Sequence, residues 1–241
     1  MEHIDIPHEL KTQGYSLLQG LAVTDSQWTN IIHTMPEAYQ QFYQSWEDLP
    51  ADDFLSDGGH YRFRRYSVFN WIMNDELVLL PHEPHFQSTY RNNMNGGIDR
   101  NFEPFKQSTI ENPVLKSFIQ LIAPQFSFNN EKSWRIQAHQ FRIVANAEEA
   151  GNPSPEGIHR DGADFILIMV LKRENISGGV NHIYDDAKRL LFGSVLTEAG
   201  DALLIDDQSV WHGVSEVYPV DINKPAYRDV LVLTFHNRTM A

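Results

Sequence analysis

The chain has 241 residues, of which 41% are hydrophobic and 12% aromatic, so we expect one globular domain, residues 1–241, with a sizeable core. The formal net charge of −13 argues against a nucleic-acid partner, because such binding depends on clustered Lys and Arg, and no apolar run approaches the roughly 18 residues of a membrane-spanning helix. The absence of cysteine excludes disulfides, thiolate zinc sites, iron–sulfur clusters and cysteine nucleophiles, so any metal must be held by nitrogen and oxygen ligands.

The N-terminal part of the chain, residues 1–57, is predicted to be a mostly helical buttress for the rest of the protein. Pro36 followed by the segment from Glu37 to Trp46 is typical of a helix that carries proline in its first turn. The segment from Met1 to Gly20 has neither a basic start nor an apolar stretch of signal-peptide length, so we expect a cytoplasmic location.

Residues 58–237 are expected to form a jelly-roll core. Residues 60–73 are rich in aromatic and β-branched side chains, as in a strand, and Pro113 opens a helix that is expected to end near residue 123. From Trp134 onward the pattern changes to short apolar strands separated by Gly, Asn, Asp and Pro turns. We therefore predict a mainly β fold with flanking α-helices, a double-stranded β-helix of the cupin-like type.

Two histidines and an aspartate in the β-rich half form a candidate metal site. His159 and Asp161 are two residues apart, so an extended backbone would point both side chains to one face. His212 follows a later apolar strand and a turn. A lone H-x-D pair is a weak signal, but two imidazoles and one carboxylate, with the remaining coordination positions open, are the ligand set of non-haem Fe(II) oxygenases. We therefore predict that these three residues bind Fe(II) and form the catalytic centre.

Arg228 is the predicted partner of the distal carboxylate of 2-oxoglutarate. It stands at the start of an alternating strand that follows His212, and a guanidinium in a partly dry barrel can grip a carboxylate through two parallel hydrogen bonds. The alternative is a salt bridge at a strand edge, because Asp229 is adjacent and other acids lie nearby.

A family resemblance rests on the segments HRDG, GGVNHIYD, DDQSVWHGV, AYRDVLVLTFH, AHQFRIVAN and YRFRRY. Together they resemble the bacterial Fe(II)/2-oxoglutarate dioxygenases that hydroxylate free L-amino acids, the L-isoleucine 4-hydroxylase type, over roughly residues 58–237. The resemblance implies a double-stranded β-helix with Fe(II), 2-oxoglutarate and O2 as its cofactor and co-substrates. It also implies that the metal ligands are His159, Asp161 and His212 and that Arg228 binds 2-oxoglutarate. Since the halogenases of this class lack the carboxylate ligand, Asp161 favours hydroxylation.

Candidate substrate-binding residues follow from what a free amino acid requires, namely a cation or amide for its α-carboxylate and an acceptor for its α-ammonium. Two groups share a strand face: Arg62, Arg64 and Tyr66, and then Gln140 and Arg142. The alternative for the first group is a set of surface arginines paired with the acidic exterior, and a similar structural role is open for the second. We expect His139, His182 and His236 to be ordinary strand histidines.

The sequence thus predicts an enzyme that hydroxylates an aliphatic carbon of a free L-amino acid and converts 2-oxoglutarate to succinate and CO2. One alternative is a cupin-like binding protein without turnover, against which the intact ligands and Arg228 count. The other alternative is a 2-oxoglutarate oxygenase that acts on a protein side chain, which would require an open docking groove.

Overall fold

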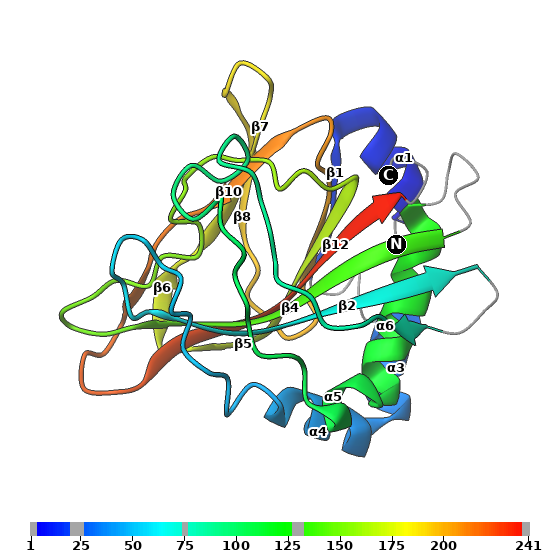
Figure 1. Cartoon of the computed structure of the whole chain (residues 1–241), viewed down its shortest axis with the longest axis horizontal. Helices are drawn as coiled ribbons and strands as arrows, with labels where there is room; N and C mark the ends of the chain where they lie inside the picture. Colours follow the sequence, from blue (N-terminus) through cyan, green and yellow to red (C-terminus); the bar gives the residue numbers. More distant parts are fainter. Residues whose placement is uncertain (1–3, 20–26, 74–76, 127–132, 238–241) are drawn as a thin grey trace.

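The large sheet of the fold consists of seven antiparallel strands (Figure 1). The computed structural model describes residues 4–19, 27–73, 77–126 and 133–237. In spatial order the strands are β1 (Tyr15–Leu18), β9 (Ala202–Asp206), β5 (Phe165–Glu174), β12 (Ala226–Asn237), β4 (Ser133–Ala145), β2 (Arg62–Ile72) and β3 (Val78–Leu79). The predicted mainly β character is confirmed.

Two smaller sheets complete the jelly roll in the part of the chain that the structure describes. The first contains β10 (Trp211–Val214), β7 (Val180–Tyr184) and β8 (Leu190–Val195), and the second contains β11 (Val217–Pro219) and β6 (Ile176–Gly178). In Figure 1 these strands lie toward the left, away from most of the helices. The long sheet and the short sheets together enclose the interior of the double-stranded β-helix.

The helices within the described residues are α1 (Ile6–Gln13), α3 (Gln27–Thr34), α4 (Pro36–Gln44), α5 (Gln107–Ile110) and α6 (Pro113–Ile122), with a short 3-10 helix η1 (Ala123–Phe126). Helix α6 lies where the sequence predicts one. The side chain of Asn112 caps it by accepting a hydrogen bond from the N–H of Val114, and Pro113 occupies the first turn, where its missing N–H costs nothing.

Each face of the large sheet packs against a different partner, because successive side chains of a strand point to opposite faces. Outward residues such as Leu167, Leu231 and Phe235 share a core with Phe42 and with the apolar side of α6. Inward residues form a second core, which includes Ile166, Ile168, Val230 and Val232 of the large sheet and Ile183 of the small sheet. The inward face is therefore available to line a site, while helices cover the outward face.

The N-terminal segment does more than buttress the barrel. Gly14, with φ +83°, ends α1 in the left-handed conformation that glycine adopts without strain, and β1 then pairs with β9 at the edge of the large sheet.

That residues 1–241 form one domain stays a prediction. Among the described residues, no helix has the length and apolar character needed to cross a membrane.

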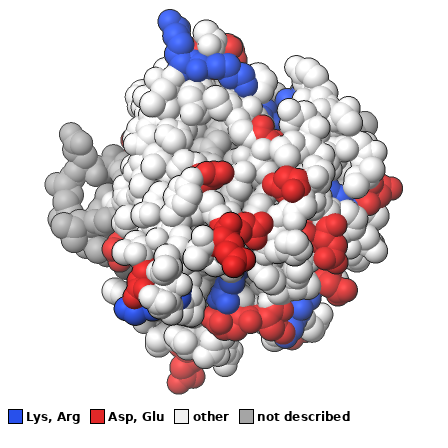
Figure 2. Space-filling model, turned by 90° about the vertical axis from the view of Figure 1, so that its left-hand side faces the viewer, with Lys and Arg blue, Asp and Glu red and all other residues white. Residues whose placement is uncertain are grey.

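Acidic side chains outnumber basic ones on the face drawn in Figure 2, which is the left-hand side of Figure 1. This agrees with the net charge of −13.

Candidate metal centre

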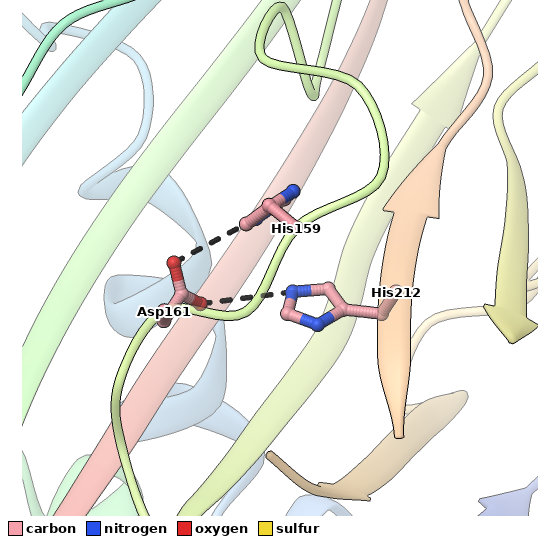
Figure 3. A group of neighbouring side chains, drawn as sticks. All are labelled: His159, Asp161 and His212. Carbon is pink, nitrogen blue, oxygen red and sulfur yellow. Dashed lines mark ion pairs between the residues drawn. The ribbon is translucent and has the colours of Figure 1, made fainter. Parts of the chain in front are cut away.

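The structure brings His159, Asp161 and His212 together (Figure 3). The first two lie on the loop that enters β5, and His212 lies on β10. Two backbone hydrogen bonds hold the loop to the strand: the N–H of His159 donates to the carbonyl of His212 at 2.9 Å, and the N–H of His212 donates back at 3.0 Å. One ligand atom from each of the three side chains lies within 4.8 Å of the other two, so the set can hold a single metal ion.

The orientation of the two imidazoles suits metal binding. Nδ1 of His159 donates to the carbonyl of Gly157 at 2.9 Å, which leaves the lone pair of Nε2 for a metal. That Nε2 lies 3.6 Å from Oδ1 of Asp161, and Nε2 of His212 lies 3.7 Å from Oδ2 of the same carboxylate. Two nitrogens and one oxygen converge in the pattern that favours a divalent transition metal.

The electrostatics of the cluster favour a cation. Burial and the neighbouring His159 lower the pKa of His212 to about 3, so His212 is neutral at physiological pH and can ligate. Burial by itself would lower the pKa of His159, but the carboxylates of Glu156 and Asp161 raise it above its usual value. The negative charge that attracts a proton to His159 also attracts a metal ion.

Asp207 supports this cluster by binding the backbone next to Asp161, and it was not predicted from the sequence. Its carboxylate accepts hydrogen bonds from the N–H groups of Asp161 at 3.2 Å, Gly162 at 2.7 Å and Ala163 at 3.0 Å. Its Oδ1 also lies 3.6 Å from Nδ1 of His212. Burial and the Asp161 carboxylate raise the pKa of Asp207 to about 7. The signal in the sequence was an acidic residue directly after the apolar strand of DALLIDD.

Arg228 and the metal cluster line the same cavity, whose volume is about 300 Å³. Arg228 is 1% exposed, its Nη2 donates to Oδ1 of Asn181 at 3.5 Å, and its Nε has no hydrogen-bond partner. Burial, with the nearby Arg173, lowers the pKa of Arg228 to about 9, as expected of a cation without an anion. Asp229 points to the outward face, where it pairs with Arg142 at 2.7 Å, so it does not form the alternative salt bridge with Arg228.

The predicted substrate residues divide between the two faces of the sheet. Arg62 and Arg64 line the cavity. Tyr66 lies on the same strand face but is fully buried. Its ring stacks on that of His139 at 4.9 Å between centroids, so it packs against a residue of the cavity wall and does not itself line the cavity.

Gln140 and Arg142 require a correction, because the structure turns both away from the cavity. Gln140 donates to Oγ of Ser45 at 2.7 Å, and Arg142 binds Asp229 and Glu47. On β4 the inward positions are the odd-numbered ones, which place His139 at the cavity wall. His139 and His236, which we expected to be ordinary strand histidines, both line the cavity.

The segment between β3 and α5 also contributes to the cavity, although its sequence has no periodic pattern that would have indicated this. His85, Gln87, Arg91 and Arg100 from this segment line the cavity. Nε2 of Gln87 donates to Oδ1 of Asp161 at 3.1 Å, so the segment contacts the candidate metal centre directly.

The sequence is similar to a family model and to curated proteins, and this similarity agrees with the predicted family resemblance. A model of the 2OG-Fe dioxygenase family matches residues 43–234. L-isoleucine-4-hydroxylase of Bacillus thuringiensis is 24% identical over 183 residues, which are 73% of this chain and 75% of that protein. The 3(1)-hydroxy-L-isoleucine 4-dioxygenase of Pantoea ananatis is 24% identical over 234 residues, covering 94% and 93% of the two chains.

Solved structures share the fold. A bsmA homolog from Methylobium petroleophilum aligns with a TM-score of 0.85 and 31% identity over 99% of this chain and 94% of its own. IDO from Bacillus thuringiensis aligns with a TM-score of 0.77 and 20% identity over 99% and 97% of the two chains. The predicted jelly-roll fold and the family resemblance are thus confirmed. The chain belongs to the 2OG-Fe dioxygenase family and is an enzyme that uses Fe(II), 2-oxoglutarate and O2.

Proposed function

We propose that this enzyme hydroxylates an aliphatic carbon of a free L-amino acid, with 2-oxoglutarate converted to succinate and CO2. The observation that carries the proposal is the cavity of about 300 Å³ that contains both the ligand cluster and the buried Arg228. A cavity of this size suits small molecules, and one of the segments that line it contacts Asp161. The names of the two curated relatives, which refer to isoleucine and hydroxy-isoleucine, support a free amino acid.

The residues of the cavity fit both groups that the family uses. We assign Fe(II) to Nε2 of His159, Nε2 of His212 and the carboxylate of Asp161, whose donor types suit it. The uncompensated guanidinium of Arg228 fits the distal carboxylate of 2-oxoglutarate. When bound, Fe(II) and 2-oxoglutarate supply the oxidising chemistry that uses O2 to hydroxylate a C–H bond.

The protein's own contribution is orientation and exclusion of water. Gly157 fixes the tautomer of His159, and Asp207 fixes the backbone that carries Asp161. Apolar side chains such as Ile168 and Val230 line the cavity beside Arg228, which excludes water and strengthens the interaction of the guanidinium with an anion.

The metal assignment is tested by adding Fe(II) and 2-oxoglutarate to the protein without oxygen and recording the visible charge-transfer band. Wild type should develop the band, and Asp161→Ala should not, because it lacks the carboxylate ligand. Asp53→Ala is the matched control, since Asp53 is an exposed aspartate. An equal band in wild type and Asp161→Ala would contradict the assignment.

The substrate class is tested by measuring succinate release with Fe(II), 2-oxoglutarate and O2 across a panel of free L-amino acids. We expect at least one amino acid to stimulate release and to gain one oxygen atom by mass. If no amino acid does so, the proposal is wrong. Oxygen gain in the intact mass of a candidate protein would instead support hydroxylation of a protein side chain.

A further inference from the structure

A second group of buried arginines lies in the same cavity, apart from Arg228. Arg62 and Arg64 project from β2, and Arg100 comes from the segment between β3 and α5. All three are nearly inaccessible, with Arg100 only 2% exposed. Buried guanidiniums require anionic partners, because removing a charge from water is costly unless it is paired.

Asp52 is the one carboxylate within 4 Å of these arginines in the described ranges of the chain. Asp52 lies 2.7 Å from Arg62 and 3.6 Å from Arg64. Arg100 has no carboxylate oxygen within 4 Å in the part of the chain that the structure describes, and its Nε has no hydrogen-bond partner. Its Nη2 donates to neutral acceptors instead, Nδ1 of His85 at 2.9 Å and Oε1 of Gln87 at 2.7 Å.

The two histidines next to these arginines, His85 and His139, are neutral and do not add to the positive charge. Burial, together with the positive charge of Arg64, lowers the pKa values of His85 and His139 well below the usual range. His139 accordingly accepts a hydrogen bond from Arg64 at 2.7 Å. Three guanidiniums therefore face one carboxylate within 4 Å, that of Asp52. The carboxylates of Glu156 and Asp161 act on Arg100 only from a longer distance, so the N–H at Nε of Arg100 is left for an anionic ligand.

Arg100 lies next to the candidate metal centre. Gln87 accepts from Arg100 through Oε1 and donates to Asp161 through Nε2 at 3.1 Å, so a single amide group separates Arg100 from a metal ligand. Oε1 of Glu156 lies 3.4 Å from Nε2 of His159, and the charge of Glu156 also acts on Arg100. Oε2 of Glu156 is buried and has no hydrogen-bond partner, so this carboxylate can accept from a cationic ligand.

We propose that Arg100 binds the α-carboxylate of the substrate and that Glu156 accepts the α-ammonium. This inference rests on the proposed function and sharpens it. The enzyme recognises both charges of a free α-amino acid, the α-carboxylate and the α-ammonium. Other compounds lack one or both of these charges: amines, deaminated acids and residues within a peptide chain. Arg228, which we assign to 2-oxoglutarate, is a separate cation on β12, with Asn181 as its polar partner.

The test measures binding rather than turnover, with Zn(II) in place of Fe(II) and with 2-oxoglutarate present. The proteinogenic L-amino acids are first ranked by thermal shift, and the strongest binder is then compared by calorimetry with its decarboxylated amine and its deaminated acid. For L-isoleucine these probes are 2-methylbutylamine and 3-methylpentanoic acid. Wild type should bind the amino acid at least about tenfold more tightly than either analogue.

Each variant should remove one preference and leave the other. Arg100→Gln should bind the amino acid no better than the amine, and Glu156→Gln should bind the amino acid no better than the deaminated acid. Arg65→Gln is the matched control, because Arg65 is on the outward face of the same strand as Arg62 and donates to the backbone carbonyl of Pro104. It carries the same change of charge and should keep both preferences.

Several outcomes would overturn the inference, and two of them need no variant. If no L-amino acid binds wild type, or if wild type binds the amine as tightly as the amino acid, the carboxylate site is wrong. The same holds if Arg100→Gln retains the wild-type preference. Binding that depends on Arg100 without any amino-acid-stimulated succinate release would instead reject the proposed function and retain the site.

Discussion

Two arginines on neighbouring strands of the large sheet differ in their electrostatic surroundings. Burial alone would lower the pKa of Arg142, but the hydrogen bonds that Arg142 donates to Asp229 and Glu47 raise it above the usual value. Arg228 lies on β12 opposite Ile143, the neighbour of Arg142 on β4. Among the described residues it has no carboxylate partner of this kind, and burial lowers its pKa. The guanidinium that has its anions is structural, whereas the one that lacks them is suited to an anionic ligand.

Replacing Arg228 by glutamine should therefore weaken 2-oxoglutarate binding strongly. Losing one partner of a buried, hydrogen-bonded charge pair costs about 2–5 kcal/mol, so we expect the dissociation constant to rise by roughly two to three orders of magnitude. The measurement is a titration of 2-oxoglutarate into Fe(II)-loaded protein without oxygen. Arg142→Gln serves as the control, since it changes the same charge on the outward face and should leave that constant unchanged. Equal constants for Arg228→Gln and wild type would reject the assignment of Arg228.

At the scale of single elements, the loop between His159 and β5 depends on one carboxylate for its conformation. The three N–H groups that donate to Asp207 belong to consecutive residues, 161–163, and Gly162 has φ +87°, a left-handed conformation that other residues rarely adopt. The side chain of Asp161 is therefore oriented by a turn whose N–H groups converge on Asp207.

We predict a graded loss of metal affinity when Asp207 is replaced. Alanine removes every acceptor for the turn and should weaken divalent metal binding by about 10–100-fold, the usual effect of losing an outer-sphere partner, whereas asparagine keeps one acceptor oxygen and should lie in between. Metal titration of the two variants, compared with Asp186→Ala, an exposed aspartate whose side chain is 82% accessible, checks this order. Wild-type affinity in Asp207→Ala would show that the turn holds without its acceptor.

The strands could be predicted from sequence because their alternation is local, but the face that carries polar partners could not. Gln140 and Arg142 seemed suited to the site because they are polar residues in an apolar strand. Their partners, Ser45 and Glu47, lie on the N-terminal side of the chain, far away in sequence. The cluster of candidate metal ligands could be predicted because two of them are close in sequence and their residue types are specific. Arg100 could not be predicted as a candidate because it belongs to an irregular segment that lines the cavity.

At the scale of the whole molecule, the candidate site joins parts of the fold that are otherwise separate. His212 belongs to the small sheet containing β7, Asp161 to the loop before β5, and Arg228 to the middle of the large sheet. A metal held by the first two links the small sheet to the large one through β5, and 2-oxoglutarate bound to Arg228 extends that link to β12. Ligand binding should therefore stabilise the barrel as a whole.

The stabilisation should occur in two separable steps. A ligand present at 100 times its dissociation constant stabilises the folded state by about 2.7 kcal/mol, which for a chain of this length corresponds to an increase in Tm of about 5–10 °C. We expect Zn(II) to raise the Tm of wild type and 2-oxoglutarate to raise it further. Asp161→Ala should lose both increments, because 2-oxoglutarate chelates the metal, whereas Arg228→Gln should keep the metal increment and lose most of the second. If 2-oxoglutarate raises the Tm of Arg228→Gln as much as that of wild type, its distal carboxylate binds elsewhere, and the link between the metal loop and β12 is absent.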